Sequence, residues 1–493
     1  MTAIFINPQL VVQKNDKFTT GIVYMPITLA YTISNFKKEN IKTKLIDLYG
    51  RNPTKCFKEN NHLIFGEKIE DIDENEFENV DCIFINANQV GNHISILNIV
   101  KFLKNRYNEI PISILENSQA VTAYSLSKIK DEFLKLGCDF ILIGDLENVT
   151  IKLYNNLNNF EYLKTLDGII TKNFSNDKID FINHLDNLPF PAWEDFPLDN
   201  YWKLGYSHGP LSNNKYLPIL SSRGCPYPCN FCVVPKTNER KWRSRSPENV
   251  VKELEYFKDK LGVIEFHFED LNPTVNDKRT KELCNLLIKK NLKINWKMVA
   301  GTKVESIKDL ETVRLLKNSG CNYISISPES GSKELMKEID KPFNYEHAIK
   351  IIKEMNKNKI FSQACFVIGY PGEKKIDLTK TKNMIFNLTK IGIDEIAIFI
   401  ITPVPGSKIY ENFEGYETLS NLTFSPIWRN DYKNLNRIRL QMYSIFLITK
   451  FIFHPLRVFK QALNFFNKSF NTKMEMVPYK VLRLKSFENN AKK

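Results

Sequence analysis

The chain has 493 residues, 43% of them hydrophobic and 25% charged, which is enough apolar material for the buried cores of two or three domains. Nine cysteines are too few for a disulfide framework, the N-terminal residues lack the pattern of a signal peptide, and no apolar stretch is long enough to span a bilayer. We therefore expect a cytoplasmic protein. The net charge of +13 alone does not distinguish nucleic acid, anionic lipid or no partner.

Residues 1–158 alternate short apolar strands with amphipathic helices, which predicts a doubly wound parallel sheet with its ligand site at the strand carboxyl ends. No G-x-G-x-x-G motif follows the first strand, which argues against a dinucleotide. A long polar loop is expected from the end of the first strand to Tyr24. Strands are expected at residues 3–6, 43–46, 82–85, 112–115 and 140–143, and helices at residues 26–36, 94–103 and 129–136.

Residues 159–216 lose this regular pattern. The segments 188–193 and 195–197 are interrupted by prolines, which do not suit the interior of a helix or a strand. We interpret this region as a linker between two domains.

Three cysteines follow the apolar strand expected at residues 217–222. Cys225, Cys229 and Cys232 have the spacing C-x-x-x-C-x-x-C, and thiolates this close together favour an iron–sulfur cluster or zinc. Three ligands would leave one iron of a 4Fe–4S cluster open. The alternative is a non-catalytic protein whose zinc ion is completed by a distant His or Cys. Arg223, next to this loop, either positions it or offsets the charge of the cluster.

The cysteine spacing, with the aromatic Phe231 before the last cysteine, resembles the signature of the radical SAM superfamily. The resemblance implies that Cys225, Cys229 and Cys232 hold a 4Fe–4S cluster and that the open iron binds the amino and carboxylate groups of S-adenosylmethionine. It also implies reductive cleavage of S-adenosylmethionine to a 5′-deoxyadenosyl radical, with the electron coming from a donor such as flavodoxin or ferredoxin.

Residues 217–414 contain six strand patterns separated by helical patterns, which predicts a partial (βα)6 barrel with its chemistry at the strand carboxyl ends. An acid after the second strand would accept the amino group of S-adenosylmethionine, and we favour Asp270 over Glu269. The end of the fourth strand suits the ribose or the sulfonium, and the glycines after the fifth permit close approach of an adenine. The strand-end residues assigned to S-adenosylmethionine are Asp270, Ser327, Glu329, Gly369, Pro371 and Gly372.

The N-terminal domain resembles the cobalamin-binding domain that precedes many radical SAM barrels, and the linker resembles the L-P-x-P-x-W segment at that junction. Two features depart from the pattern: residues 116–120 stand where a glycine pair is usual, and no D-x-H-x-x-G motif offers a histidine to cobalt. The alternative is a domain that keeps this fold without the corrin. The residues that the resemblance assigns to cobalamin are Asn7, Pro8, Gly144 and Glu147.

Residues 415–493 form a C-terminal region that is mainly helical. Residues 437–466 carry many aromatic side chains and cations without an acid, and Pro455 should break or kink the helix there. Such a segment suits either peripheral contact with anionic lipid at the inner face of the membrane or a helical cap on the barrel mouth. No RNA-binding module accompanies the charge, so no nucleic acid is expected.

Together these features predict a cobalamin-dependent radical SAM methyltransferase that acts on an unactivated carbon of an apolar small molecule or lipid. The resemblance also allows a cyclase or a rearrangement enzyme without methyl transfer. A methylthiotransferase is disfavoured because that branch places three more cluster ligands before the barrel, whereas Cys56, Cys82 and Cys138 are widely spaced.

Overall fold

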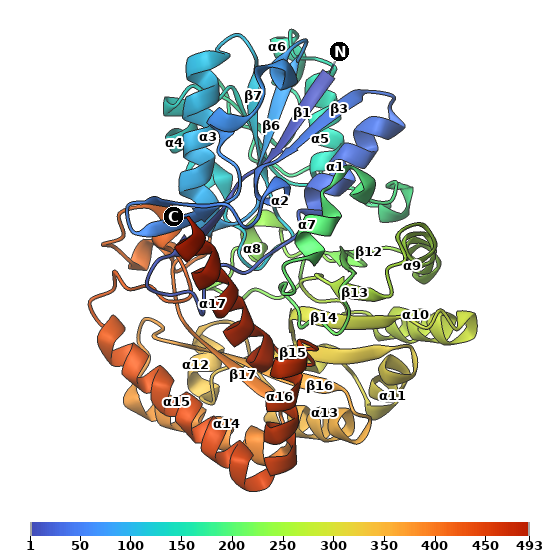
Figure 1. The fold of residues 1–493 in the computed structure, drawn as a ribbon, viewed down its shortest axis with the longest axis vertical. Helices are drawn as coiled ribbons and strands as arrows, with labels where there is room; N and C mark the ends of the chain where they lie inside the picture. Colours follow the sequence, from blue (N-terminus) through green and yellow to red (C-terminus); the bar gives the residue numbers. More distant parts are fainter. Residues whose placement is uncertain (1, 492–493) are drawn as a thin grey trace.

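The computed structural model describes residues 2–491 and shows an α/β protein, as the alternation of strands and helices predicted. Two six-stranded sheets form two lobes, one above the other in Figure 1, with helices packed around them. One hydrophobic core cluster includes side chains from both lobes, for example Phe84 above and Phe366 below. The lobes are therefore joined by a continuous core.

The sheet of the N-terminal lobe has the strand order β3-β1-β6-β7-β8-β9, and only β9 is antiparallel to its neighbour. Phe5, Phe36 and Phe84 pack ring against ring in its core, with centroids 5.0–5.7 Å apart. The strands are β1 (Thr2–Asn7), β3 (Lys42–Asp47), β6 (Cys82–Ala87), β7 (Ile112–Glu116), β8 (Phe140–Leu142) and β9 (Ile169–Ile170). The helices are α1 (Ile27–Lys38), α2 (Leu48–Arg51), α3 (His93–Arg106), α4 (Lys130–Lys135) and α5 (Leu146–Tyr154).

A small antiparallel sheet corrects the expectation of a polar loop after β1. Its order is β2-β5-β4, and its strands are β2 (Leu10–Gln13), β4 (Cys56–Glu59) and β5 (His62–Phe65). The run Leu10-Val11-Val12 was too short to stand out in the sequence, but β5 supplies the partner that turns it into a strand. The chain then crosses residues 14–26 before α1 begins.

The segment between the lobes has short elements and many turns. Its first part stays with the upper lobe, where α6 (Phe160–Leu163) lies at the top in Figure 1 and β9 joins the sheet, whereas α7 (Leu198–Trp202) follows nearer the second lobe, and Trp193 in the proline-rich stretch is fully buried. The prolines therefore fix a packed strap rather than a flexible linker.

The second sheet has six parallel strands in the order β10-β13-β14-β15-β16-β17, as the alternation of strands and helices predicted. Local signals define α9: Ser246 caps its N-terminus by accepting a hydrogen bond from the Asn249 amide at 3.1 Å, and Gly262 ends it with φ of +69°. The strands are β10 (Tyr216–Ile219), β13 (Glu265–Phe268), β14 (Asn295–Thr302), β15 (Cys321–Glu329), β16 (Phe361–Ile368) and β17 (Glu395–Ile400), with the ribbon β11 (Ser222–Arg223) and β12 (Arg243–Ser244). The helices are α8 (Val234–Thr237), α9 (Pro247–Leu261), α10 (Asp277–Lys290), α11 (Leu310–Asn318), α12 (Lys333–Glu338), α13 (Tyr345–Lys357) and α14 (Lys375–Ile391).

Three helices close the chain: α15 (Tyr432–Phe453), α16 (Pro455–Asn467) and α17 (Lys473–Asn490). Pro455 starts α16 after a bend of 111°, as its position in the sequence predicted. Among the described residues no single helix is long and apolar enough to cross a bilayer, and only the bent pair α15–α16 meets that criterion jointly. Helix α17 runs from the lower lobe to the upper one, where Phe487 packs against Phe65.

Candidate functional site

A cavity of about 720 Å³ lies at the carboxyl ends of the second sheet. Cys225, Cys229 and Cys232 line it, together with the ends of β14 to β17. The N-terminal lobe contributes residues of the 16–24 segment and Val121, and the C-terminal helices α15 and α17 close another side. Most of the lining side chains are apolar, so the cavity suits a bulky apolar ligand with few polar contacts.

The cysteine loop is held by the antiparallel ribbon of β11 and β12. Gly224, which opens the loop, has φ of +76°, and a Cβ atom there would lie 2.0 Å from the carbonyl oxygen of Lys241. All three cysteines are free and face one cavity, so the donor set fits the predicted cluster.

Ser327 and Glu329 are brought to this cavity, as the sequence predicted. Glu329 has φ of +57°, a strained conformation for a residue other than glycine, and it forms a buried ion pair with Lys341. Burial alone would lower the pKa of Lys341, but the charges of Glu329 and Cys229 raise it above its usual value. Lys341 is therefore a cation beside the cysteine loop.

Asp270, the acid predicted to bind S-adenosylmethionine, lies behind the cysteine loop rather than in the cavity wall. Its carboxylate is buried and accepts hydrogen bonds from the Ser221 amide (3.0 Å), the Ser221 hydroxyl (2.7 Å) and the Ser222 hydroxyl (2.6 Å). Asp270 does not line the cavity. Burial raises the pKa of Asp270, and the three hydrogen bonds oppose that shift. Asp270 therefore holds the strand end from which the cysteine loop departs, and its contact with S-adenosylmethionine stays a prediction.

The turn after β16 is likewise outside the cavity lining. Pro371 and Gly372 are exposed, and the carbonyl oxygen of Gly369 accepts hydrogen bonds from the Arg429 guanidinium, both at 3.1 Å. Gly369 and Gly372 have positive φ, so they shape a turn that meets the C-terminal segment. Their predicted contact with an adenine is not supported.

The residues assigned to cobalamin are buried in the N-terminal lobe, with protein neighbours in place of a ligand. Asn7 donates a hydrogen bond to Asp47 at 2.8 Å, Pro8 is buried beside it, and a Cβ on Gly144 would lie 2.6 Å from Ile179. Glu147 is buried and binds Arg223 through both carboxylate oxygens, at 3.0 and 2.5 Å. None of the four lines the cavity.

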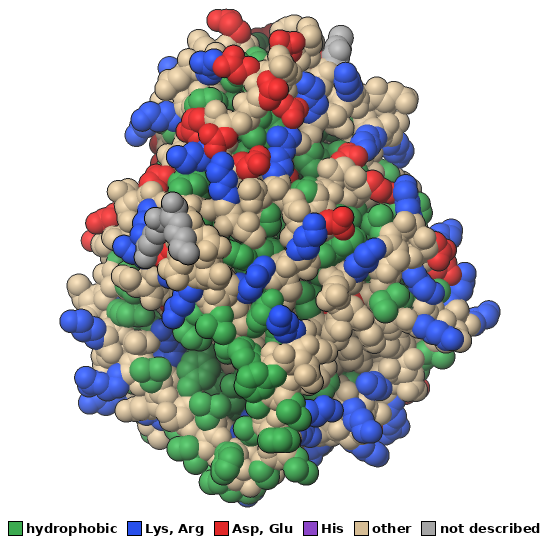
Figure 2. Space-filling model, in the orientation of Figure 1, with side chains coloured by type: hydrophobic (Ala, Val, Ile, Leu, Met, Phe, Trp, Pro, Cys, Tyr) green, Lys and Arg blue, Asp and Glu red, His purple; other side chains and the backbone are tan. Residues whose placement is uncertain are grey.

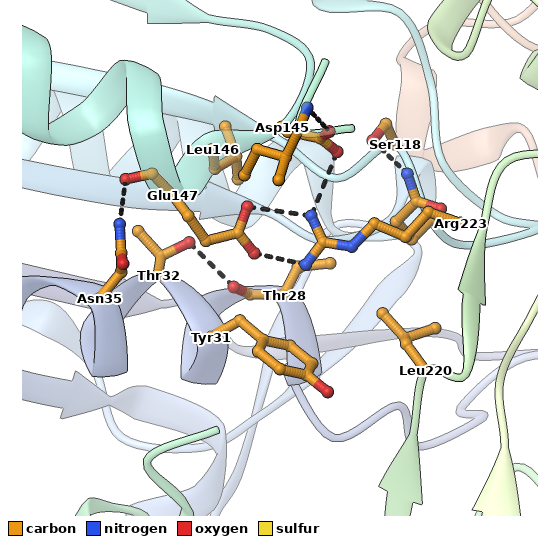
Figure 3. Close-up of polar contacts among 12 residues, drawn as sticks. Thr28, Tyr31, Thr32, Asn35, Ser118, Asp145, Leu146, Glu147, Leu220 and Arg223 are labelled. Carbon is orange, nitrogen blue, oxygen red and sulfur yellow. Dashed lines mark hydrogen bonds and ion pairs between the residues drawn. The ribbon is translucent and has the colours of Figure 1, made fainter. Parts of the chain in front are cut away.

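Arg223 joins the cysteine loop to the N-terminal lobe (Figure 3). Its guanidinium also binds Asp145 at 3.1 Å and lies 5.5 Å from the ring centre of Tyr31. Arg243, from the paired strand, forms a second ion pair with Asp145. Burial alone would lower the pKa of Arg223, but Glu147 and Asp145 raise it. Arg223 is therefore a positioning residue, which decides between its two predicted roles.

Gln119 explains why the loop after β7 departs from the usual glycine pair. Its amide oxygen accepts a hydrogen bond from the Gly224 backbone at 3.0 Å, and its amide nitrogen donates to Asn238 at 2.9 Å. Asn238 in turn donates to the Ser118 carbonyl at 2.8 Å. The side chains of this loop therefore support the first residue of the cysteine loop.

A polar group in the cavity wall was not predicted. His208 Nδ1 lies 2.7 Å from a carboxylate oxygen of Glu269, and Lys473 and Glu395 line the same cavity. Burial lowers the pKa values of His208 and Lys473 and raises that of Glu395 to about 7. His208 comes from the irregular segment and Lys473 from the start of α17, neither of which carries a motif. Of this group the sequence pointed only to Glu269, as the less favoured alternative to Asp270.

Lys480 of α17 holds the segment of residues 16–24 over the cavity, and its burial makes the stability of the protein depend on pH. Its Nζ donates to the carbonyl oxygens of Thr20 (2.6 Å) and Phe18 (3.3 Å). Burial lowers the pKa of Lys480 from 10.5 to about 7. Between these values the unfolded chain binds more protons than the folded protein, so this group makes the free energy of unfolding rise with pH.

Replacing Lys480 with methionine is therefore expected to flatten the pH dependence of stability. The stability of the wild type relative to Lys480→Met should increase from pH 7 towards pH 10.5. Urea unfolding of both proteins near each end of this window measures the difference. A difference that stays constant with pH would contradict the assignment.

Comparisons with known proteins agree with this site. Residues 219–385 match the family model described as Radical SAM superfamily. An uncharacterized methyltransferase of Pyrococcus horikoshii is 27% identical over 297 residues, which are 59% of this chain and 60% of that protein. The anaerobic magnesium-protoporphyrin IX monomethyl ester cyclase of Synechocystis is 26% identical over 279 residues, 55% of this chain and 53% of that protein.

Among solved structures, the radical S-adenosylmethionine methyltransferase TsrM from Kitasatospora setae, with cobalamin and a [4Fe-4S] cluster bound, shares the fold. The TM-score is 0.60 at 13% identity, over 85% of this chain and 79% of that one. The chain spans 60% or less of the two curated relatives named above. The family match covers the cysteine loop and the four strands β13 to β16, and residues 219–385 of the chain form a radical SAM domain.

Proposed function

We propose that the chain is a cobalamin-dependent radical SAM enzyme that methylates an unactivated carbon of an apolar substrate. The observation that carries the proposal is a single cavity that joins the three-cysteine loop to side chains of both lobes. The methyltransferase relative from Pyrococcus horikoshii and the fold shared with TsrM support it.

The cavity offers a place for each cofactor. Cys225, Cys229 and Cys232 would hold the 4Fe–4S cluster, and Ser327 and Glu329 lie beside it for S-adenosylmethionine. The apolar side that faces the N-terminal lobe would receive cobalamin, and its lining there is Phe18, Ile22, Tyr24 and Val121. When bound, these cofactors supply a 5′-deoxyadenosyl radical and a transferable methyl group.

The protein's own part is to position the reactants and to exclude water. The interaction of Arg223 with Glu147 fixes the cysteine loop against the N-terminal lobe. The loop held by Lys480 and the C-terminal helices shield the apolar cavity, which protects a carbon radical from side reactions. Lys341 keeps a positive charge beside the cysteine loop, and a flavodoxin or ferredoxin would supply the electron.

A cyclase or rearrangement reaction is the second candidate. It is favoured by the Synechocystis cyclase, which matches about as much of the chain as the methyltransferase does. Such a reaction would use the same cluster and cavity without adding a methyl group.

Product analysis with methyl-labelled S-adenosylmethionine distinguishes the two. The anaerobically reconstituted protein, loaded with cobalamin and given a reductant and host extract, is expected to form 5′-deoxyadenosine and S-adenosylhomocysteine in equal amounts. One S-adenosylmethionine would be split by an electron from the reductant into methionine and a 5′-deoxyadenosyl radical, which would take the hydrogen atom from the substrate; a second would supply the labelled methyl group that replaces it. 5′-Deoxyadenosine without S-adenosylhomocysteine would favour the cyclase or rearrangement. Absence of both products would overturn the proposal.

A further inference from the structure

The bent pair of helices α15 and α16 exposes a continuous set of large apolar side chains, which we call the apolar face. Figure 2 shows hydrophobic side chains gathered over this part of the lower lobe, around a hollow. No residue of α16, all of which is described, is buried, and Leu456 is 83% exposed. A soluble protein rarely leaves so large an apolar patch without a partner. The apolar face consists of Leu440, Leu447, Ile448, Phe451, Ile452, Phe453, Leu456, Phe459, Leu463 and Phe466.

The charged side chains of α15 and α16 are all positive. No Asp or Glu occurs between Asp431 and Glu475; Lys473 of that segment lines the cavity, and the other cations fall into two groups. Arg439, Lys450 and Arg457 have structural partners inside the protein, respectively the Ser425 hydroxyl, Gln461 and Asp394. The exposed cations are Lys433, Arg437, Lys460 and Lys468. The charge therefore complements an anionic surface.

The geometry fits the interface of a bilayer rather than its interior. The two helices meet at 111°, so they do not form one straight span. Amphipathic helices with bulky apolar residues on one side and exposed cations beside them lie in the interface of anionic membranes. We infer that the apolar face of α15 and α16 is a docking surface for an anionic lipid bilayer and that the cavity takes its apolar substrate from there.

The cavity reaches this surface. Leu440 and Leu447 belong to the apolar face and also line the cavity, and Tyr443 lies between them on α15. Val477 and Pro478 of α17 line the same cavity. An apolar molecule can therefore pass from the bilayer into the cavity without crossing water. This second half of the inference rests on the proposed function, whereas docking itself does not.

Sedimentation of the purified full-length protein with vesicles tests the docking. The wild type is expected to sediment with phosphatidylglycerol-rich vesicles and much less with pure phosphatidylcholine. The triple variant Phe451→Ser, Phe459→Ser, Phe466→Ser should partition at least about tenfold more weakly, because three large side chains no longer enter the interface. A matched control is Phe160→Ser with Tyr162→Ser, exposed aromatics of the other lobe, which should bind as the wild type does.

The charge variant Lys460→Glu with Lys468→Glu should remove the preference for anionic lipid. Equal sedimentation of the wild type and the triple variant would overturn the inference. So would a wild type that does not bind vesicles but forms a dimer that the triple variant cannot form, since the apolar face would then be covered by a second copy of the chain.

S-Adenosylmethionine cleavage is measured in parallel on the same variants. None of the substituted side chains lines the cavity, so the substitutions should leave cleavage unchanged. Docking without cleavage would refute the proposed function alone, and cleavage without docking the membrane inference alone.

Discussion

Replacing Cys229 with alanine is expected to reduce the iron bound after anaerobic reconstitution to background and to abolish cleavage of S-adenosylmethionine. Cys229 is the central member of the loop, and two remaining thiolates cannot hold a cluster that needs three protein ligands. The fold should persist, because the side chain lies at a cavity wall rather than inside the core. Iron analysis, visible absorption and circular dichroism of the same sample measure the three effects.

Cys365→Ala is the matched control for this prediction. Cys365 lines the same cavity from β16, and its thiol lies 3.5 Å from the Ser325 hydroxyl, away from the C-x-x-x-C-x-x-C loop in the sequence. This variant should keep its iron. Normal iron content in Cys229→Ala, or equal loss in both variants, would contradict the assignment of the cluster ligands.

The sequence was sufficient for features that depend on local pattern. The alternation of strands and helices predicted the second sheet with all six strands, and the cysteine spacing located the loop that lines the cavity. Pro455 predicted the break between α15 and α16, because proline lacks the amide that a helix interior needs. These signals act over a few residues, so they are visible without the tertiary structure.

Features that depend on which side chain meets which could not be predicted in this way. An acid at a strand end has the same appearance whether it faces a ligand or, like Asp270, the hydroxyls of Ser221 and Ser222. Glu147 likewise suited a ligand role, but its partner is Arg223, 76 residues away. Helix α17 was missed as an element of its own, because Pro478 lies inside it and its buried residues contact both lobes.

The contact between Glu147 and Arg223 leads to the second large effect. Glu147→Gln is expected to lower the free energy of unfolding by about 3 kcal/mol, because removing one partner of a buried ion pair leaves the other charge uncompensated. Asp145 remains bound to Arg223, which keeps the loss at the lower end of the usual range for such pairs. Equilibrium unfolding in urea measures the loss.

Two further variants separate this effect from a general loss of charge. Arg51→Met removes an ion pair with Glu76 in which both side chains are about one-third exposed, and it should cost less than about 1 kcal/mol. Arg223→Met combined with Glu147→Leu should recover part of the stability, since it leaves neither member of the pair alone, although Asp145 then keeps only Arg243.

The retained iron decides whether the pair also positions the cysteine loop. Arg223 directly precedes Gly224, whose backbone is held by Gln119, so weakening the contacts of Arg223 removes part of the support for the start of the loop. Glu147→Gln should therefore lose iron faster than the wild type to a chelator at a denaturant concentration where both proteins are folded. Two results together would contradict this: a loss of unfolding free energy in Glu147→Gln no larger than in Arg51→Met, and the same iron retention as in the wild type. The contact of Glu147 with Arg223 would then not support the cluster site.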